Sequence, residues 1–146
     1  MPEVIARLVA LGEADEELHD VRVSDGPEVT ADASLDWLII GFDGDPSGDF
    51  EAAQSVISWT DLGTGGEEEW QVTVAAIVHR GDTDVVAARA RVYEIGSRVD
   101  AWLRTDPSLG LLSLQAGIGA MRLTQDQTDR GAQAVLLMTV AGRAFT

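Results

Sequence analysis

The sequence predicts an α+β fold, in which one long helix packs across a mostly antiparallel sheet of about five to six strands and a short helix precedes them. Along residues 70–79, apolar side chains of the kind found in protein cores occupy every second position, which is the period of a strand. Over residues 83–104 the apolar residues recur every three and four positions, which is the stripe of an amphipathic helix. Strand-like segments on both sides of this pair supply the rest of the sheet, and the 146 residues are expected to form a single domain.

The first half of the chain is expected to hold the short helix and three or four strands. An apolar stripe over residues 2–11 predicts the helix, and Gly12 predicts its end. The acid-rich stretch 13–20 is expected to be a solvated connection or a frayed extension of that helix. Strands are expected at residues 21–23, 35–42 and 54–59.

The long helix has recognisable ends. Either Asp82 or Thr83 is expected to cap it by accepting from the first free amide groups, and Asp84 complements its positive end. The pair 106–107, Asp-Pro, ends it. Gly96 lies in the helix interior, where it costs about 1 kcal/mol relative to Ala, and therefore predicts close packing.

Two more strands are expected after the long helix, over residues 114–121 and 132–140. They are expected to form a hairpin, joined by a polar turn over residues 125–130. One face of the first strand carries small residues at Gly117 and Gly119, which predicts that another element packs closely there.

The composition excludes some classes of protein and constrains others. There is no cysteine, which rules out disulfides and thiolate metal sites, and there is no run of about 18 apolar residues, so a soluble protein made inside the cell is expected. The net charge is −15, and it is unevenly placed. Residues 1–69 hold 18 acids and 2 arginines, giving −16, whereas residues 70–146 hold 7 acids and 8 arginines, giving +1. The acidic half disfavours binding to nucleic acid or acidic membranes.

No residue pattern predicts catalysis, a cofactor or a metal centre. His19 and His79 each lack a nearby partner in the sequence, and no serine lies in a nucleophile turn. Residues 43–51 place oxygen-bearing side chains much as a calcium loop does, but Pro46 stiffens the segment and Gln54 stands where a bidentate Glu is needed. An acidic loop that ends a strand is the favoured interpretation, and calcium binding stays open.

Two features are candidate interfaces. The Gly-rich acidic segment 61–69 is expected to be a mobile hairpin loop. On the long helix, Arg91 and Arg98 lie two turns apart, either paired locally, as Glu94 with Arg98, or facing the acidic half of a neighbouring copy. This row of arginines is only weak evidence for a surface that binds nucleic acid. The candidate interface residues are Asp61, Gly65, Gly66, Glu67, Glu68, Glu69, Arg91 and Arg98.

Taken in order, several segments resemble the tail terminator family of bacteriophages with long, non-contractile tails, in the form found in phages of high-GC hosts. The resemblance spans nearly the whole chain and rests on the order of its segments. They are the short N-terminal helix and residues 23–27 (VSDGP), 37–41 (WLIIG), 70–74 (WQVTV), 79–82 (HRGD) and 106–110 (DPSLG).

This resemblance implies a structural virion protein without enzymatic activity or cofactor. It implies a homomeric ring, usually a hexamer, that caps the finished tail tube, ends its polymerisation and forms the surface that joins the head. The implied partners are the tail tube protein and a head-completion or neck protein, at the head–tail junction, after assembly in the host cytoplasm and without a membrane. An acidic lumen would let DNA pass without specific binding, and segment 61–69 is the natural candidate for a lumen-facing or tube-facing contact.

Two alternatives stay open. The first is another ring protein of the neck, a head–tail connector or head-completion subunit, which local sequence scarcely separates from a terminator. The second is a small acidic binding or inhibitor protein that mimics nucleic acid.

Overall fold

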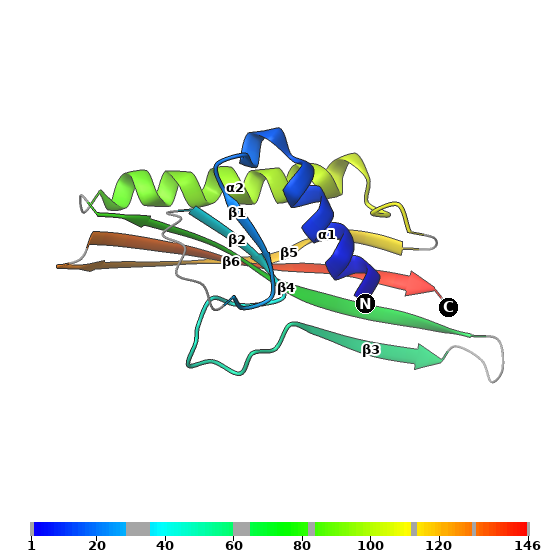
Figure 1. Ribbon diagram of the computed structural model, residues 1–146. Helices are drawn as coiled ribbons and strands as arrows, with labels where there is room; N and C mark the ends of the chain where they lie inside the picture. Colours follow the sequence, from blue (N-terminus) through cyan, green and yellow to red (C-terminus); the bar gives the residue numbers. More distant parts are fainter. Residues whose placement is uncertain are drawn as a thin grey trace.

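The computed structural model describes residues 2–28, 36–59, 65–81, 84–111, 114–129 and 131–145, and Figure 1 shows their arrangement. Both helices lie on one side of a single six-stranded sheet, and the longer helix runs along it (Figure 1). The expected α+β architecture is therefore confirmed. In chain order the elements are α1 (Pro2–Ala14), the 3-10 turn η1 (Glu16–Leu18), β1 (Arg22–Asp25), β2 (Asp36–Ile40), β3 (Ala53–Trp59), β4 (Gly66–Arg80), α2 (Val85–Thr105), β5 (Leu114–Thr128) and β6 (Gly131–Phe145).

The long strand β4 organises the sheet, because it has two partners along one edge and a third along the other. Residues 66–72 of β4 pair with β3, and residues 74–78 pair with β2. The opposite edge of β4 pairs with β6 over its length, and β6 pairs with β5. All these pairs are antiparallel, and only β1 and β2 are parallel among the described strands. At one end the sheet therefore has the order β3-β4-β6-β5.

The main core lies between the sheet and the two helices. Along β4, alternate side chains from Trp70 to Val78 are buried against α2, as the period of two predicts. At two positions in this core, a glycine leaves room for a large neighbouring side chain. A Cβ atom at Gly96 would lie 2.8 Å from Leu136 Cδ2, which confirms the close packing expected for that helix position, and one at Gly142 would lie 2.6 Å from Trp70 Cζ2.

The other face of the sheet carries no helix among the described residues. A small apolar cluster covers it at the β2 end, where the loop after β2 folds back so closely that a Cβ atom at Gly44 would lie 2.7 Å from Ile77 Cδ1. Toward the β3 end the side chains on this face are mostly polar. We call this polar region the helix-free face; its members include Gln54, Glu69, Gln71, Thr139 and Arg143.

Two expected helix ends are wrong. Helix α1 continues past Gly12 to Ala14, because the glycine is used for packing: a Cβ atom there would lie 2.9 Å from Val23 Cγ1. The acid-rich stretch 13–20 extends α1 by two residues, which is one of the two arrangements expected for it, and then forms η1, which buries Leu18. Helix α2 is capped by Asp84, whose side chain accepts from Ala87 N at 3.0 Å, and residues 82–83 lie outside the described part.

The loops around two strands are also shorter than expected. Strand β5 continues to Thr128, so the polar segment that begins at Gln125 is strand rather than turn. Strand β4 begins at Gly66, so the acidic residues before Trp70 belong to the ladder.

The end of α2 agrees with expectation, because Asp106 N–H donates to Trp102 O at 3.0 Å as the C-cap. On β5, the expected close packing is found at Gly119, where a Cβ atom would lie 3.3 Å from Ala141 Cβ, but not at Gly117, which has nothing within 4 Å of where a Cβ atom would be.

Candidate assembly interface

Strand β3 is an edge strand that exposes large apolar side chains. It forms the edge of the sheet that lies farthest from α2 in Figure 1, and among the described residues only β4 pairs with it. Val56 is 58% exposed, Ile57 52% and Trp59 69%. In register, Ile57 and Trp59 stand on the helix side of the sheet and Val56 on the helix-free face. The strand sequence, AQSVISW, contains no charge and no proline that would discourage pairing with another strand.

The acidic residues of segment 61–69 belong to this strand pair rather than to a mobile loop. Glu67, Glu68 and Glu69 lie in β4 between β3 and β6, while Asp61 lies outside the described residues. Arg143 Nη1 lies 3.4 Å from Glu67 Oε1, and Glu69 is exposed. Pairing on both edges fixes these glutamates as strand, which overrides their low intrinsic preference for it.

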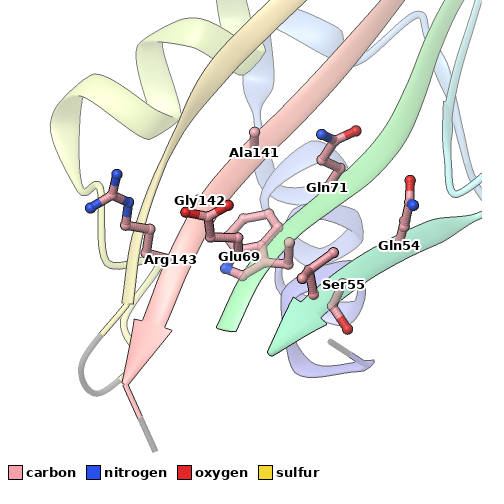
Figure 2. Close-up of a pocket in the computed structure, with 9 residues that line it drawn as sticks. Gln54, Ser55, Glu69, Gln71, Ala141, Gly142 and Arg143 are labelled. Carbon is pink, nitrogen blue, oxygen red and sulfur yellow. The ribbon is translucent and has the colours of Figure 1, made fainter. Parts of the chain in front are cut away.

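A shallow hollow of about 420 Å³ lies where β3, β4 and β6 meet. Figure 2 shows Gln54 and Gln71 pointing the same way from neighbouring strands, with Glu69 and Arg143 beside them. These groups offer amides, one carboxylate and one guanidinium, but no positioned base with a nucleophile. The hollow therefore offers both polar groups and apolar surface for a contact.

Arg91 is held within its own chain. Its Nε donates to Asp36 Oδ2 at 3.0 Å, its Nη2 to Asp20 Oδ1 at 2.7 Å and its Nη1 to Glu94 Oε2 at 2.9 Å. Arg80 Nη1 donates to the other oxygen of Asp36 at 2.7 Å. Burial raises the pKa of Asp36, but the hydrogen bonds from Arg80 and Arg91 outweigh burial and hold that pKa below its ordinary value. This cluster joins α2, β2 and β4.

Arg98 is also engaged within the chain, so the expected pair with Glu94 is wrong. Its Nε donates to Asp15 Oδ2 at 2.8 Å, and Trp102 Nε1 donates to the same oxygen at 2.8 Å. The hydrogen bond to Asp15 raises the pKa of Arg98. Burial raises the pKa of Asp15, but the bonds from Arg98 and Trp102 outweigh it and lower the pKa overall. The arginine stripe thus fastens the N-terminal segment onto α2.

The acidic loop over residues 43–51 is built from local turns. Asp43 Oδ1 accepts from Asp45 N at 2.8 Å, Asp45 Oδ1 from Ser47 N at 2.8 Å, and Asp49 Oδ1 from Glu51 N at 3.0 Å. Such turns explain why aspartates recur there. Across the described part of the chain, no group of three or more His, Cys, Asp or Glu side chains could hold a metal ion.

Sequence reasoning missed the apolar members of this interface. Val56, Ile57 and Trp59 were expected to lie in a strand, but the sequence does not show that both helices stop short of them. The available signal was a strand with apolar residues on both faces and no charge, in a chain that is otherwise strongly acidic. We call the surface formed by these three residues the β3 patch.

Fold and surface together define an α+β chain with one mixed sheet, helices on one face and an unprotected apolar edge strand. No known protein family model matches the sequence, and no curated protein matches it. Neither of the described helices is long and apolar enough to cross a membrane.

Proposed function

We propose that this chain is a structural subunit of a bacteriophage tail, a terminator that forms a homomeric ring on the end of the tail tube. The β3 patch carries this proposal. A seven-residue edge strand with three exposed apolar side chains and no protecting charge invites association in an isolated molecule, and burial in an assembly removes that exposure. The order of the sequence segments, which resembles the terminator family, supports the same assignment.

The helix-free face supports a ring whose lumen lets DNA pass. It is polar at the β3 end, where Glu67 and Glu69 lie with Arg143 and with neutral amide and hydroxyl groups. Each subunit has a net charge of −15, so a ring of such subunits has a negative overall potential that disfavours binding of the phosphate backbone. In this arrangement the sheet forms the inner wall, and α1 and α2 lie outside it.

Electron microscopy of tails assembled without this protein tests the proposal. Tubes of irregular, excessive length are expected, because nothing would stop polymerisation. Tails of normal length that fail to join heads would instead indicate a head-side connector, the second neck protein that these surfaces fit. Purified protein added back should restore the normal length distribution.

The high negative charge favours one candidate of a different class, a small acidic protein that binds a basic partner in place of nucleic acid. Such a protein would form a tight 1:1 complex and would not associate with itself. Sedimentation of the purified chain over a wide range of concentration separates the two functions.

A further inference from the structure

Strand β5, like β3 and β1, has one edge that no other described strand pairs. Among the described residues only β6 pairs with it, and Ala116 N donates outward, to Pro107 O at 2.8 Å. From Ile118 onward no described backbone group bonds to the outer side of β5. Because successive neighbours in the order β3-β4-β6-β5 are antiparallel, β3 and β5 run in opposite directions at opposite edges.

A hollow of about 390 Å³ lies beside this free edge, between β5 and the second half of α2. It begins where the β5–β6 register shifts between Ile118 and Ala120, and bulges of this kind bend a strand and increase its twist. Met121 is 45% exposed here, and the side chain of Arg104 is 79% exposed on the helix above. We call this hollow the β5 socket; it is lined by Asp100, Arg104, Ile118, Gly119, Ala120 and Met121.

We propose that β3 of one copy pairs antiparallel with residues 118–123 of β5 in the next copy, and that its Ile57 and Trp59 fill the β5 socket. This inference rests on the proposed ring and names the contact that closes it. In a continuous sheet each face is shared, so Ile57 and Trp59, on the helix side of β3, meet the helix side of β5. There the socket offers an apolar floor, and Arg104 can lie over the indole ring.

Charge favours this head-to-tail contact over a symmetric one. Two copies joined through their β3 strands would place the acids Glu67, Glu68 and Glu69 of the two copies about 14 Å apart across the two β3 strands, where like charges still repel at low ionic strength. Arg122, next to the socket, is exposed and makes no ion pair with any described residue, and the same is true of Glu69. Both side chains stand on the helix-free face, so the proposed pairing brings a free cation toward a free acid.

A head-to-tail contact also determines the kind of assembly. Each copy gives β3 to one neighbour and β5 to the other, and such contacts close into a ring when the rotation between copies permits it. Along the sheet, β3 is level with the start of β5, whereas the free edge begins at Ile118. The pairing is therefore staggered along the strands, as closed sheets require.

The test uses two variants of the whole chain, each lacking one half of the contact. Trp59→Asp removes the group that enters the socket, and Met121→Asp blocks the socket. Each variant alone is expected to stay monomeric, because every contact needs one intact β3 patch and one intact socket. An equimolar mixture is expected to form a 1:1 dimer, since a single functional contact remains. Val86→Asp, at a similarly exposed apolar residue in the first turn of α2, is the matched control and should assemble as the wild type does.

Sedimentation velocity and circular dichroism read out both assembly and folding. If Met121→Asp lowers the melting temperature, Arg104→Trp replaces it, because this exposed residue of α2 lines the socket and an indole ring there would fill it. A milder variant, Trp59→Ala, is expected to raise the dissociation constant of self-association about 30-fold, a typical loss for a central interface tryptophan. Arg122→Glu and Glu69→Arg should each weaken assembly, and the double variant should recover it.

Several outcomes would overturn the β3–β5 contact. One is a mixture that stays monomeric while the wild type forms rings, and another is a single variant that assembles normally. In both, the proposed function would stand, with a different contact closing the ring. A wild type that remains monomeric up to about 1 mM also overturns this pairing. The proposed function is then tested separately, by measuring the lengths of tails grown without the protein.

Discussion

Arg98 Nε lies 2.8 Å from Asp15 Oδ2, although the two residues are 83 positions apart in the chain. The arginine belongs to the outward row of α2, and the acid belongs to the link between α1 and η1. Because Trp102 Nε1 donates to the same oxygen, Asp15 joins the N-terminal segment to the long helix at a single atom. The side chain of Asp15 is almost fully buried, so this contact holds the subunit together rather than facing a neighbour.

The first prediction concerns the stability of the isolated subunit. Asp15→Ala is expected to lower the free energy of unfolding by about 2 kcal/mol, because two donors lose a common acceptor. Arg98→Glu is expected to lower it as well, by bringing a second carboxylate to the same place. Urea denaturation of dilute, monomeric protein measures both effects.

Arg104→Glu is the control for that experiment. It breaks an exposed pair with Asp100 on the same helix and should leave the urea midpoint nearly unchanged. If Arg98→Glu left the monomer as stable as the wild type and only weakened assembly, Arg98 would belong to an intersubunit contact after all.

The second prediction is a loss of stability in acid that depends on Asp36. Hydrogen bonds from Arg80 and Arg91 outweigh burial and hold the pKa of Asp36 below the value of about 3.9 that applies in the unfolded chain. The stabilisation is therefore complete well above pH 4 and is lost as the pH falls through the lower, folded pKa.

Asp36→Asn measures this contribution. The substitution is expected to cost about 3 kcal/mol at pH 7, because it leaves two arginines without their shared carboxylate. The difference between wild type and variant should shrink when urea denaturation is repeated at pH 3. Asp126→Asn, at an exposed residue that makes no ion pair in the described part of the chain, should show little difference at either pH. A difference for Asp36→Asn that is constant with pH would contradict an ionised, stabilising Asp36.

The fold was predictable because burial sets the spacing of apolar residues. The period of two along β4 and the stripe of α2 follow from one buried face each, and Gly96 marked the point where the helix meets Leu136. Strand boundaries were less predictable. Glu67 to Glu69 have low preference for strands, and only pairing with β3 and β6 on both sides keeps them extended.

The candidate site was predictable only in part. The acidic segment was expected to be a loop, but its glutamates lie in strand β4. Apart from Glu94, the acids that hold Arg91 and Arg98 lie 55 to 83 residues away, where no local pattern predicts the pairs. The β3 patch depends on where the helices end in space, which no local window of sequence contains. Long-range contacts therefore determine which charged residues are paired within the subunit and which apolar surfaces remain exposed.

The third prediction is that self-association strengthens when salt is added at low ionic strength. Each copy carries a net charge of −15, so copies repel one another at long range before the β3 patch can be buried. Raising the salt from about 0.01 M to about 0.15 M shortens the screening length from about 30 Å to about 8 Å. The dissociation constant from sedimentation should therefore fall. A rise would show that local ion pairs, such as Arg122 with Glu69, outweigh the overall repulsion.

The fourth prediction separates two glycines of the β5–β6 hairpin. Gly142 faces Trp70 across the strand pair, and a Cβ atom there would collide with the Gln115 backbone carbonyl as well as lie 2.6 Å from Trp70 Cζ2. Gly142→Ala is expected to cost about 3 kcal/mol or more, because a paired strand cannot move aside as a flexible side chain can. Gly117→Ala is expected to be neutral or to stabilise by about 0.5 kcal/mol, because nothing lies within 4 Å of the new methyl group and the unfolded chain loses freedom. Urea denaturation of the two variants should therefore give shifts that differ several-fold, and equal shifts would mean that Trp70 does not depend on Gly142 for its place in the core.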